Sequence, residues 1–295
     1  MESAYDKLPR AYRLPDATRL GTVRLQVADL TRSLSFYSHV VGFQKLDQSE
    51  KRATLGVPGN ATPIVELIEL AGSTPVPRRG RLGLFHFAIL VPDRAALGRF
   101  VAHLSELGIR AGSADHLVSE ALYLPDPDGL GIEVYADRPR ALWGRNGNEL
   151  VMATNPLDLS DLARAAGETP WDGMPVGTVI GHVHLHVGDL DEGRAFFHTA
   201  LGLDPTVWSY PGALFLSAGG YHHHLGINTW AGPGAAWPKA DDARLLEWEI
   251  LLPTASDADA AARSVEEAGY SVTRAEAGWM LVDPWGTAVR LTWSD

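Results

Sequence analysis

The residue best placed to do chemistry is an acid on an otherwise apolar strand. Glu133 follows a turn over Asp126–Gly129, in which Pro127 presets φ and the glycine supplies a positive φ, so two strands are predicted to fold back as a hairpin. Side chains alternate along a strand, so Glu133 faces away from Ile132 and Val134. An ionised carboxylate in an enclosed cavity is strongly disfavoured unless a cation or a donor partners it. Glu133 is therefore a candidate metal ligand or, in the simpler interpretation, an acid on a solvated strand face.

Histidines form the second group of candidate residues. His86 stands between two phenylalanines, where it could bind a metal or serve as a hydrogen-bonded core residue. His182, His184 and His186 alternate and share one face of a predicted strand, which makes that face polar rather than plain core. The chain has 11 His and no Cys, so any metal must be held by imidazole and oxygen ligands. Disulfides, thiolate zinc sites and cysteine nucleophiles are excluded.

Length and composition narrow the classes of partner. At 295 residues the chain is long enough for two ordinary domains, and 45% hydrophobic with 21% charged residues is typical of a soluble globular protein. A formal net charge of -11 disfavours nucleic acid and anionic membranes, which leaves small molecules or proteins. The amino terminus is polar and interrupted by proline, and no apolar run reaches the ~18 residues that a membrane span requires. We expect a cytoplasmic protein.

One structural unit occurs four times along the chain. Each copy is predicted to contain a strand, a short polar turn, an amphipathic helix ended by glycine, and further strands, in the order β-α-β-β-β. The copies begin at Thr22, His86, His182 and Glu247. The first strand residue and the glycine are 20 positions apart in units one and three and 22 positions apart in units two and four. A pair of units has therefore been duplicated, and the predicted fold class is α+β.

The longest join between units runs from Arg138 to Thr178. It contains four prolines and a short predicted helix near Leu159 to Ala166. Long joins of this composition are typical of domain boundaries. We therefore expect an N-terminal domain over residues 1–137 with units one and two, a connector over 138–178, and a C-terminal domain over 179–295 with units three and four.

The repeated units carry motifs that resemble a known family. The motifs are HFAIL at 86–90, SEALYLPDPDGLGIEVYADRP at 119–139, GHVHLHV at 181–187 and GGYHHHLGINTW at 219–230. Together they are similar to the vicinal oxygen chelate superfamily of glyoxalases, bleomycin-resistance proteins and type I extradiol dioxygenases, and most of all to its bacterial catechol 2,3-dioxygenase group. The resemblance covers residues 21–292 and implies that pairs of units curl into two half-open barrels.

The resemblance also implies where the metal ligands lie, at the start of a unit's first strand and on its last strand. At these positions His86, Glu133 and His182 supply two imidazoles and one carboxylate. That set leaves open positions on Fe(II) for a substrate and O₂. The repeat register selects His182, and His184 remains the alternative ligand. Fe(II) is the implied metal, and Mn(II) is the alternative.

These three ligands converge only if the units pair in a crossed order. Unit two must pack against unit three, so that unit one packs against unit four, and we expect this arrangement. If unit one instead paired with unit two, Glu66 would join His86 and Glu133. That site would lack one ligand, because Thr22 is a poor substitute. Unit four carries Arg290 where the acid would stand and is expected to bind no metal.

Three further residues match catalytic positions of extradiol enzymes. In the histidine run 222–224, the strand register assigns the acid-base role to His224. Tyr123, ten positions before Glu133, matches the tyrosine that hydrogen-bonds the substrate, although tyrosine on a strand also serves in packing. His116 resembles a third group near the substrate, at a spacing that departs from the usual pattern. The histidine run is otherwise interpreted as a surface feature or an additional metal site.

The implied activity is ring cleavage of catechol or a substituted catechol by O₂, giving a muconic semialdehyde-type product in aromatic hydrocarbon catabolism. The implied partner is a small aromatic diol, with no nucleic acid and no membrane, and the pattern allows a homo-oligomer. Four aromatic residues either shape the substrate pocket or cover the barrel: Trp208, Tyr210, Trp230 and Trp237. Two other functions stay open. One is a glyoxalase-like isomerase or lyase with Ni, Zn or Mn, and the other is a metal-free binding protein.

Overall fold

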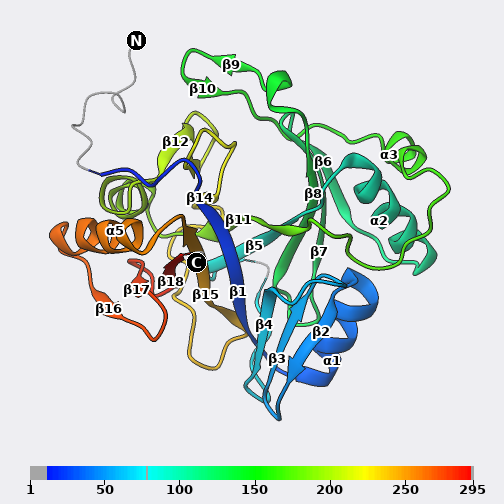
Figure 1. Ribbon diagram of the computed structural model, residues 1–295, viewed down its shortest axis with the longest axis horizontal. Helices are drawn as coiled ribbons and strands as arrows, with labels where there is room; N and C mark the ends of the chain where they lie inside the picture. The colour runs from blue at the N-terminus through cyan, green and yellow to red at the C-terminus, as the bar shows by residue number, and fades with distance from the viewer. Residues whose placement is uncertain (1–11, 78, 294–295) are drawn as a thin grey trace.

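The computed structural model describes residues 12–77 and 79–293, whose strands form two large curled sheets (Figure 1). In spatial order the first sheet contains β16 (Val272–Arg274), β17 (Trp279–Val282), β18 (Ala288–Trp293), β15 (Arg244–Leu252), β1 (Arg19–Val27), β4 (Pro63–Glu69), β3 (Arg52–Gly56) and β2 (Gln44–Gln48). The second contains β12 (Asp204–Val207), β13 (Ala213–Ser217), β14 (Leu225–Asn228), β11 (Val179–His186), β5 (Gly83–Leu90), β8 (Gly131–Asp137), β7 (Ser119–Pro125) and β6 (Gly112–Asp115).

Each sheet has one seam at which two units meet. In the first sheet β1 of unit one runs antiparallel to β15 of unit four, and in the second β5 of unit two runs antiparallel to β11 of unit three. Within every unit the first strand pairs in parallel with the last, which the helical crossover between them permits. The predicted crossed pairing and the α+β class with four repeated units are therefore confirmed.

A helix follows the first strand of every unit. These helices are α1 (Leu30–Phe36), α2 (Arg94–Glu106), α4 (Leu190–Arg194) and α5 (Ala255–Glu267), and α1 and α4 continue into the π-helical turns η2 (Tyr37–Val41) and η4 (Ala195–Ala200). An Asp or Thr side chain caps each start by accepting a backbone N–H: Asp29, Asp93, Asp189 and Thr254. Gly42 ends the first helix with φ 92°, and an added Cβ there would lie 2.6 Å from Trp171. This is a position that only glycine satisfies.

The connector between units two and three packs against the second sheet. It contains η3 (Arg140–Leu142), the short hairpin β9 (Arg145–Asn146) and β10 (Glu149–Leu150), and α3 (Leu159–Ala165). Helix α3 lies beside α2 (Figure 1), and Gly98 of α2 permits this approach because a Cβ there would lie 2.4 Å from the carbonyl of Leu162. The division of the chain into two domains on either side of this connector stays a prediction.

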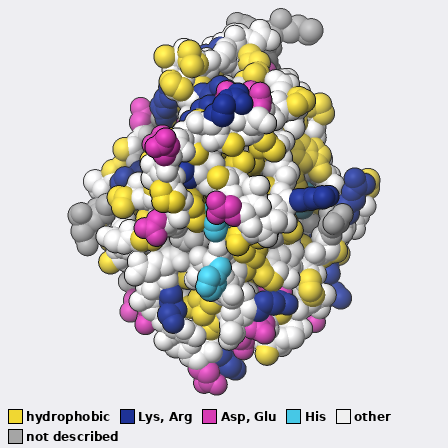
Figure 2. All heavy atoms as spheres, turned by 90° about the vertical axis from the view of Figure 1, so that its right-hand side faces the viewer, with side chains coloured by type: hydrophobic (Ala, Val, Ile, Leu, Met, Phe, Trp, Pro, Cys, Tyr) yellow, Lys and Arg dark blue, Asp and Glu magenta, His cyan; other side chains and the backbone are white. Residues whose placement is uncertain are grey.

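The sheets and helices enclose one large hydrophobic core, in which Tyr37, Phe87 and Trp248 are among the largest fully buried side chains. On the face shown in Figure 2, Lys and Arg side chains are interspersed with Asp and Glu, so no large patch of one charge gathers there. Over residues 12–77 and 79–293, the helices are all too short or too polar to cross a membrane.

Candidate metal centre and active site

Three neighbouring strands of the second sheet bring the predicted ligands together. β5 carries His86, β8 carries Glu133 and β11 carries His182. Ala88 of β5 lies opposite Glu133 on one side and opposite His182 on the other. His86, two residues before Ala88, points to the same face of the sheet. The methyl group of Ala88 therefore leaves room among the three ligands, where a larger side chain would intrude.

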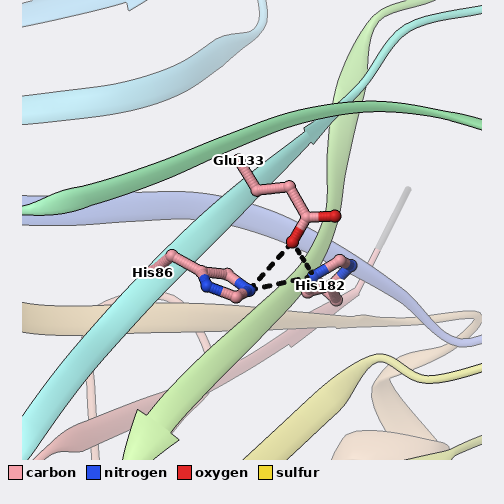
Figure 3. A group of neighbouring side chains, drawn as sticks. All are labelled: His86, Glu133 and His182. Carbon is pink, nitrogen blue, oxygen red and sulfur yellow. Dashed lines mark hydrogen bonds and ion pairs between the residues drawn. The ribbon is translucent and has the colours of Figure 1, made fainter. Parts of the chain in front are cut away.

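The three ligand atoms form a nearly regular triangle (Figure 3). Nε2 of His86 and Nε2 of His182 are 3.3 Å apart, and Oε2 of Glu133 lies 2.9 Å from the first and 3.0 Å from the second. Two bonds of roughly 2.1 Å at right angles to one metal place their ligand atoms about 3.0 Å apart. The spacing thus matches one face of an octahedral site, and the donor set is that of non-haem Fe(II) oxygenases. The residues fit a bound divalent metal.

Burial and mutual contact set the protonation states of this group. His86, Glu133 and His182 are only 5%, 2% and 1% exposed. Burial alone would raise the pKa of Glu133, but the imidazoles of His182 and His86 outweigh it and hold that pKa well below its usual value. Burial lowers the pKa of His182 to about 4, although Glu133 opposes the shift. At neutral pH the site offers a carboxylate and a neutral imidazole, which are the forms that bind metals.

A hydrogen-bond chain engages the Nε2 atom of His184, the alternative candidate ligand. The backbone N–H of Trp230 donates to Oδ1 of Asn228 at 3.0 Å, which fixes the orientation of that buried amide. Nδ2 of Asn228 therefore donates to Nε2 of His184 at 2.9 Å. Burial lowers the pKa of His184 well below its ordinary value, so the ring is neutral and carries its proton on Nδ1. Its Nε2 lone pair is occupied, and the geometry favours His182 as the ligand.

A cavity of about 390 Å³ is lined by all three ligands. Most of its wall is aromatic or imidazole, and the lining residues are Phe85, His86, His116, Ser119, Tyr123, Glu133, Met152, Thr154, His182, His184, Tyr210, Phe215, His223 and Trp230. Tyr210 and Trp230 belong to this wall as the sequence suggested, whereas Trp208 and Trp237 do not. Met152 and Thr154 come from the connector, and no motif in the sequence marked them as site residues.

Tyr123 and His116 also line the cavity and bond to each other. Nδ1 of His116 lies 2.6 Å from the carbonyl oxygen of Ala153, which can only accept, so His116 donates from Nδ1. In the neutral ring, Nε2 then accepts the hydroxyl proton of Tyr123 at 2.6 Å. Burial, reinforced by the charge of Glu133, raises the pKa of Tyr123 well above its ordinary value. Tyr123 therefore keeps its proton, and the structure brings both predicted residues to the ligands.

The structure does not bring His224 to this cavity. Strand β14 begins only at Leu225, so residues 222–224 lie in a bend where strand alternation does not apply. His224 lines a second cavity of about 620 Å³, and its Nδ1 accepts the backbone N–H of Ala218 at 3.2 Å. His223 lines the ligand cavity instead, with its ring centroid 4.1 Å from that of His182. The structure thus brings His223, and not His224, to the candidate ligands, and the acid-base role of either residue stays a prediction.

Hydrogen bonds connect His223 to a half-buried acid. Nε2 of His222 lies 2.9 Å from Oδ1 of Asp137, and because a carboxylate only accepts, His222 donates from Nε2. In its neutral form His222 then accepts at Nδ1 from Nδ1 of His223, 2.7 Å away. Burial holds the pKa of His223 well below its ordinary value. A neutral ring with its proton on Nδ1 has a free Nε2 lone pair, which is what a general base requires.

The corresponding seam of the first sheet holds ion pairs. Arg24 of β1 lies 2.7 Å from Glu66 and 3.2 Å from Glu247. Arg290, at the position equivalent to Glu133, lies 2.6 Å from Glu247. Across the described part of the chain, one group of three or more His, Asp or Glu side chains has ligand atoms close enough together to share a metal ion, and it is the group of the second sheet.

The fold and this ligand set define a class of protein that comparison with known families identifies. Residues 19–134 and 179–280 match the model of the Glyoxalase/Bleomycin resistance protein/Dioxygenase superfamily. The chain belongs to this superfamily. It is 46% identical to the catechol-2,3-dioxygenase of Bacillus subtilis strain 168 over 272 residues, which span 90% of this chain and 94% of that protein.

Solved structures share the fold at low sequence identity. A protein of Bacillus subtilis subsp. subtilis str. 168, provisionally named a dioxygenase, superposes with a TM-score of 0.67 at 14% identity and covers 96% of this chain and 86% of its own. Glyoxalase I from Zea mays superposes with a TM-score of 0.54 at 20% identity and covers 93% of this chain and 92% of its own. These similarities establish the architecture of paired βαβββ units.

Proposed function

We propose that this protein is an Fe(II)-dependent extradiol dioxygenase, which cleaves the ring of catechol or a substituted catechol with O₂ to give a muconic semialdehyde-type product. The observation that carries the proposal is the convergence of His86, Glu133 and His182 on one cavity that is large enough for an aromatic ring. The 46% identity to the B. subtilis catechol-2,3-dioxygenase supports the same reaction class.

The three ligands would hold Fe(II), with Mn(II) as the alternative ion. When bound, the metal would supply a Lewis acid for the two diol oxygens and the redox chemistry through which the diol and O₂ react. The protein supplies a dry setting for that chemistry, because the ligands are almost fully buried and aromatic rings form much of the cavity wall.

His223 is proposed as the acid-base residue. Its free Nε2 accepts a proton from a diol hydroxyl, while the bond from its Nδ1 to His222 holds the ring in position. Asp137, bonded to the far side of His222, stabilises the positive charge that develops along this chain. The same Nε2 can return that proton as the ring opens. A group in this role contributes about 10²–10⁴-fold to the rate.

Tyr123 and His116 are proposed to stabilise negative charge on the substrate. Tyr123 keeps its proton at neutral pH, and when the substrate is bound it would transfer its one hydrogen bond from Nε2 of His116 to a substrate oxygen that gains negative charge. His116 positions the Tyr123 hydroxyl, because its own ring is fixed by the carbonyl of Ala153.

A metal-dependent isomerase or lyase is less well supported. That activity would favour a fourth carboxylate such as Glu66, but Glu66 lies on β4 of the other sheet and pairs with Arg24 at 2.7 Å. It is therefore not available to this centre. A metal-free binding protein would have no need for three converging ligand atoms.

The proposal is tested by loading the protein with Fe(II), adding catechol under argon and then admitting air. We expect O₂ uptake and a yellow ring-cleavage product, and neither with His86→Ala. Failure of both signals across a panel of catechols and hydroquinones would reject the function. Metal analysis of protein purified without added metal separates an iron enzyme from a nickel or zinc isomerase. Ligand affinity that survives His86→Ala unchanged would indicate a metal-free binding protein.

A further inference from the structure

The cavity at the metal ligands is larger than one diol ring requires. An apolar cavity of about 150 Å³ is sufficient to hold benzene. This cavity measures about 390 Å³. A catechol bound through its two oxygens near His86, Glu133 and His182 therefore leaves about half of the cavity or more for a substituent on the ring.

The wall of this cavity is apolar and rich in aromatic rings. The ring centroids of Phe85 and Trp230 are 5.7 Å apart, those of Tyr210 and Trp230 are 6.1 Å apart, and those of Tyr210 and Phe215 are 5.8 Å apart. Phe85 and Trp230 are 37% and 39% exposed and both line the cavity, so part of each side chain is free to contact a ligand. The unbranched thioether of Met152 adds a surface that adapts to different shapes. Such a wall favours a flat or alkyl apolar group.

The charged residues that line the cavity also favour an apolar substituent. Among the described residues of its wall there is no Lys or Arg, and Glu133 is the one acid. Binding would transfer a substrate carboxylate from water to an aromatic wall that offers no guanidinium or ammonium partner, which is unfavourable. The site therefore disfavours an anionic substituent while it favours an apolar one.

We propose that the substrate is a catechol carrying an uncharged, apolar substituent of up to about the size of a second ring, and that carboxylated catechols are rejected. This inference rests on the proposed ring-cleaving function and names its substrate class. Phe85, Tyr210, Phe215, Trp230 and Met152 are the specificity-determining residues.

The test measures binding separately from turnover. Iron-loaded protein under argon is titrated calorimetrically with catechol, 3-phenylcatechol and 3,4-dihydroxybenzoate. We expect 3-phenylcatechol to bind about 10–100-fold more tightly than catechol, as burial of one ring predicts, and 3,4-dihydroxybenzoate to bind more weakly than catechol. Trp230→Ala should remove most of the gain from the phenyl group. The exposed Trp237, outside the cavity wall, provides the control Trp237→Ala, which should leave all three affinities unchanged.

A charge introduced into the wall should change the preference. Met152→Lys places an ammonium group where the apolar thioether stood, and it should strengthen 3,4-dihydroxybenzoate binding and weaken 3-phenylcatechol binding. Equal or tighter binding of 3,4-dihydroxybenzoate by the unaltered protein would overturn the inference. If the predicted order of affinities holds but no diol consumes O₂ after air is admitted, the ring-cleaving function fails and the selectivity stands. If O₂ is consumed but the order is reversed, the selectivity fails alone.

Discussion

Asp126, in the turn before β8, is a buried acid whose ionisation weakens the folded state. It is 5% exposed, and burial raises its pKa from 3.8 to about 6. The hydrogen bonds that Oδ1 accepts from the backbone N–H groups of Asp128 and Leu130, each 2.8 Å long, oppose this shift without cancelling it. The perturbation is Asp126→Asn, which removes the charge and keeps an amide oxygen for both N–H groups, while the Tyr37 hydroxyl, 3.2 Å from Oδ2, loses its acceptor and must itself accept from the amide nitrogen.

The expected magnitude follows from the two pKa values. Because the folded value lies above the unfolded one, stability from this group is complete below about pH 4 and is lost as the pH rises through about 6. A difference of about 2 pKa units corresponds to roughly 3 kcal/mol. We therefore expect Asp126→Asn to raise the free energy of unfolding at pH 7.5 by as much as about 3 kcal/mol. At pH 4 it should have little effect.

Urea unfolding at pH 4, 5.5 and 7.5 provides the assay. Asp283 lies in the equivalent turn of unit four with a pKa raised to about 6, so Asp283→Asn should behave in the same way. Asp191, whose side chain is 85% exposed, supplies the control Asp191→Asn, for which we expect no pH-dependent gain. A loss of stability at pH 7.5 on replacing Asp126 would refute the reasoning, because it would mean that the charged hydrogen bonds outweigh burial.

Three further predictions concern the site. Glu133→Gln should lower the amount of iron bound per protein molecule, because this carboxylate is the one anionic residue in the proposed ligand set. Metal analysis measures the bound iron, and retention of stoichiometric iron would contradict the ligand assignment. His223→Asn should retain iron and lower kcat by about 10²–10⁴-fold in stopped-flow and steady-state assays. His224→Asn keeps an acceptor for the Ala218 N–H and should have nearly unchanged turnover. Equal effects of the two substitutions on kcat would contradict the acid-base role of His223. Ala88→Leu should prevent metal binding by filling the space between the ligands, while Ala88→Ser should preserve it. Titration of both variants with iron measures their occupancy, and full occupancy in the leucine variant would refute the steric argument.

The convergence of the three candidate ligands could be predicted because the family resemblance implies the ligand positions and the repeats restrict which residues occupy them. His86, Glu133 and His182 stand at those positions, and their convergence required the crossed pairing that the seams now confirm. His184 remained an alternative in the sequence, since residues two apart on a strand share a face. Only the orientation of the Asn228 amide, a tertiary feature, shows that Nε2 of His184 is occupied.

The position of His224, away from the cavity at the candidate ligands, has a physical origin. Alternation of side chains holds within a strand, but the histidine run precedes the first residue of β14, and the bend there rotates His223 toward the cavity. The length and the prolines of the connector predict a domain boundary, which stays a prediction, and the structure adds that Met152 lines the cavity and that the Ala153 carbonyl accepts a hydrogen bond from His116. Residues in irregular segments have no periodicity that could have revealed these contacts.

The crossed pairing allows the two seams of the molecule to differ in sequence. Two identical half-chains joined about a twofold axis would build two identical seams, and any substitution would alter both at once. In a single continuous chain the seams are encoded by different codons. One, between β5 and β11, can carry imidazoles for chemistry, while the other, between β1 and β15, is bridged by ion pairs among Arg24, Glu66, Glu247 and Arg290.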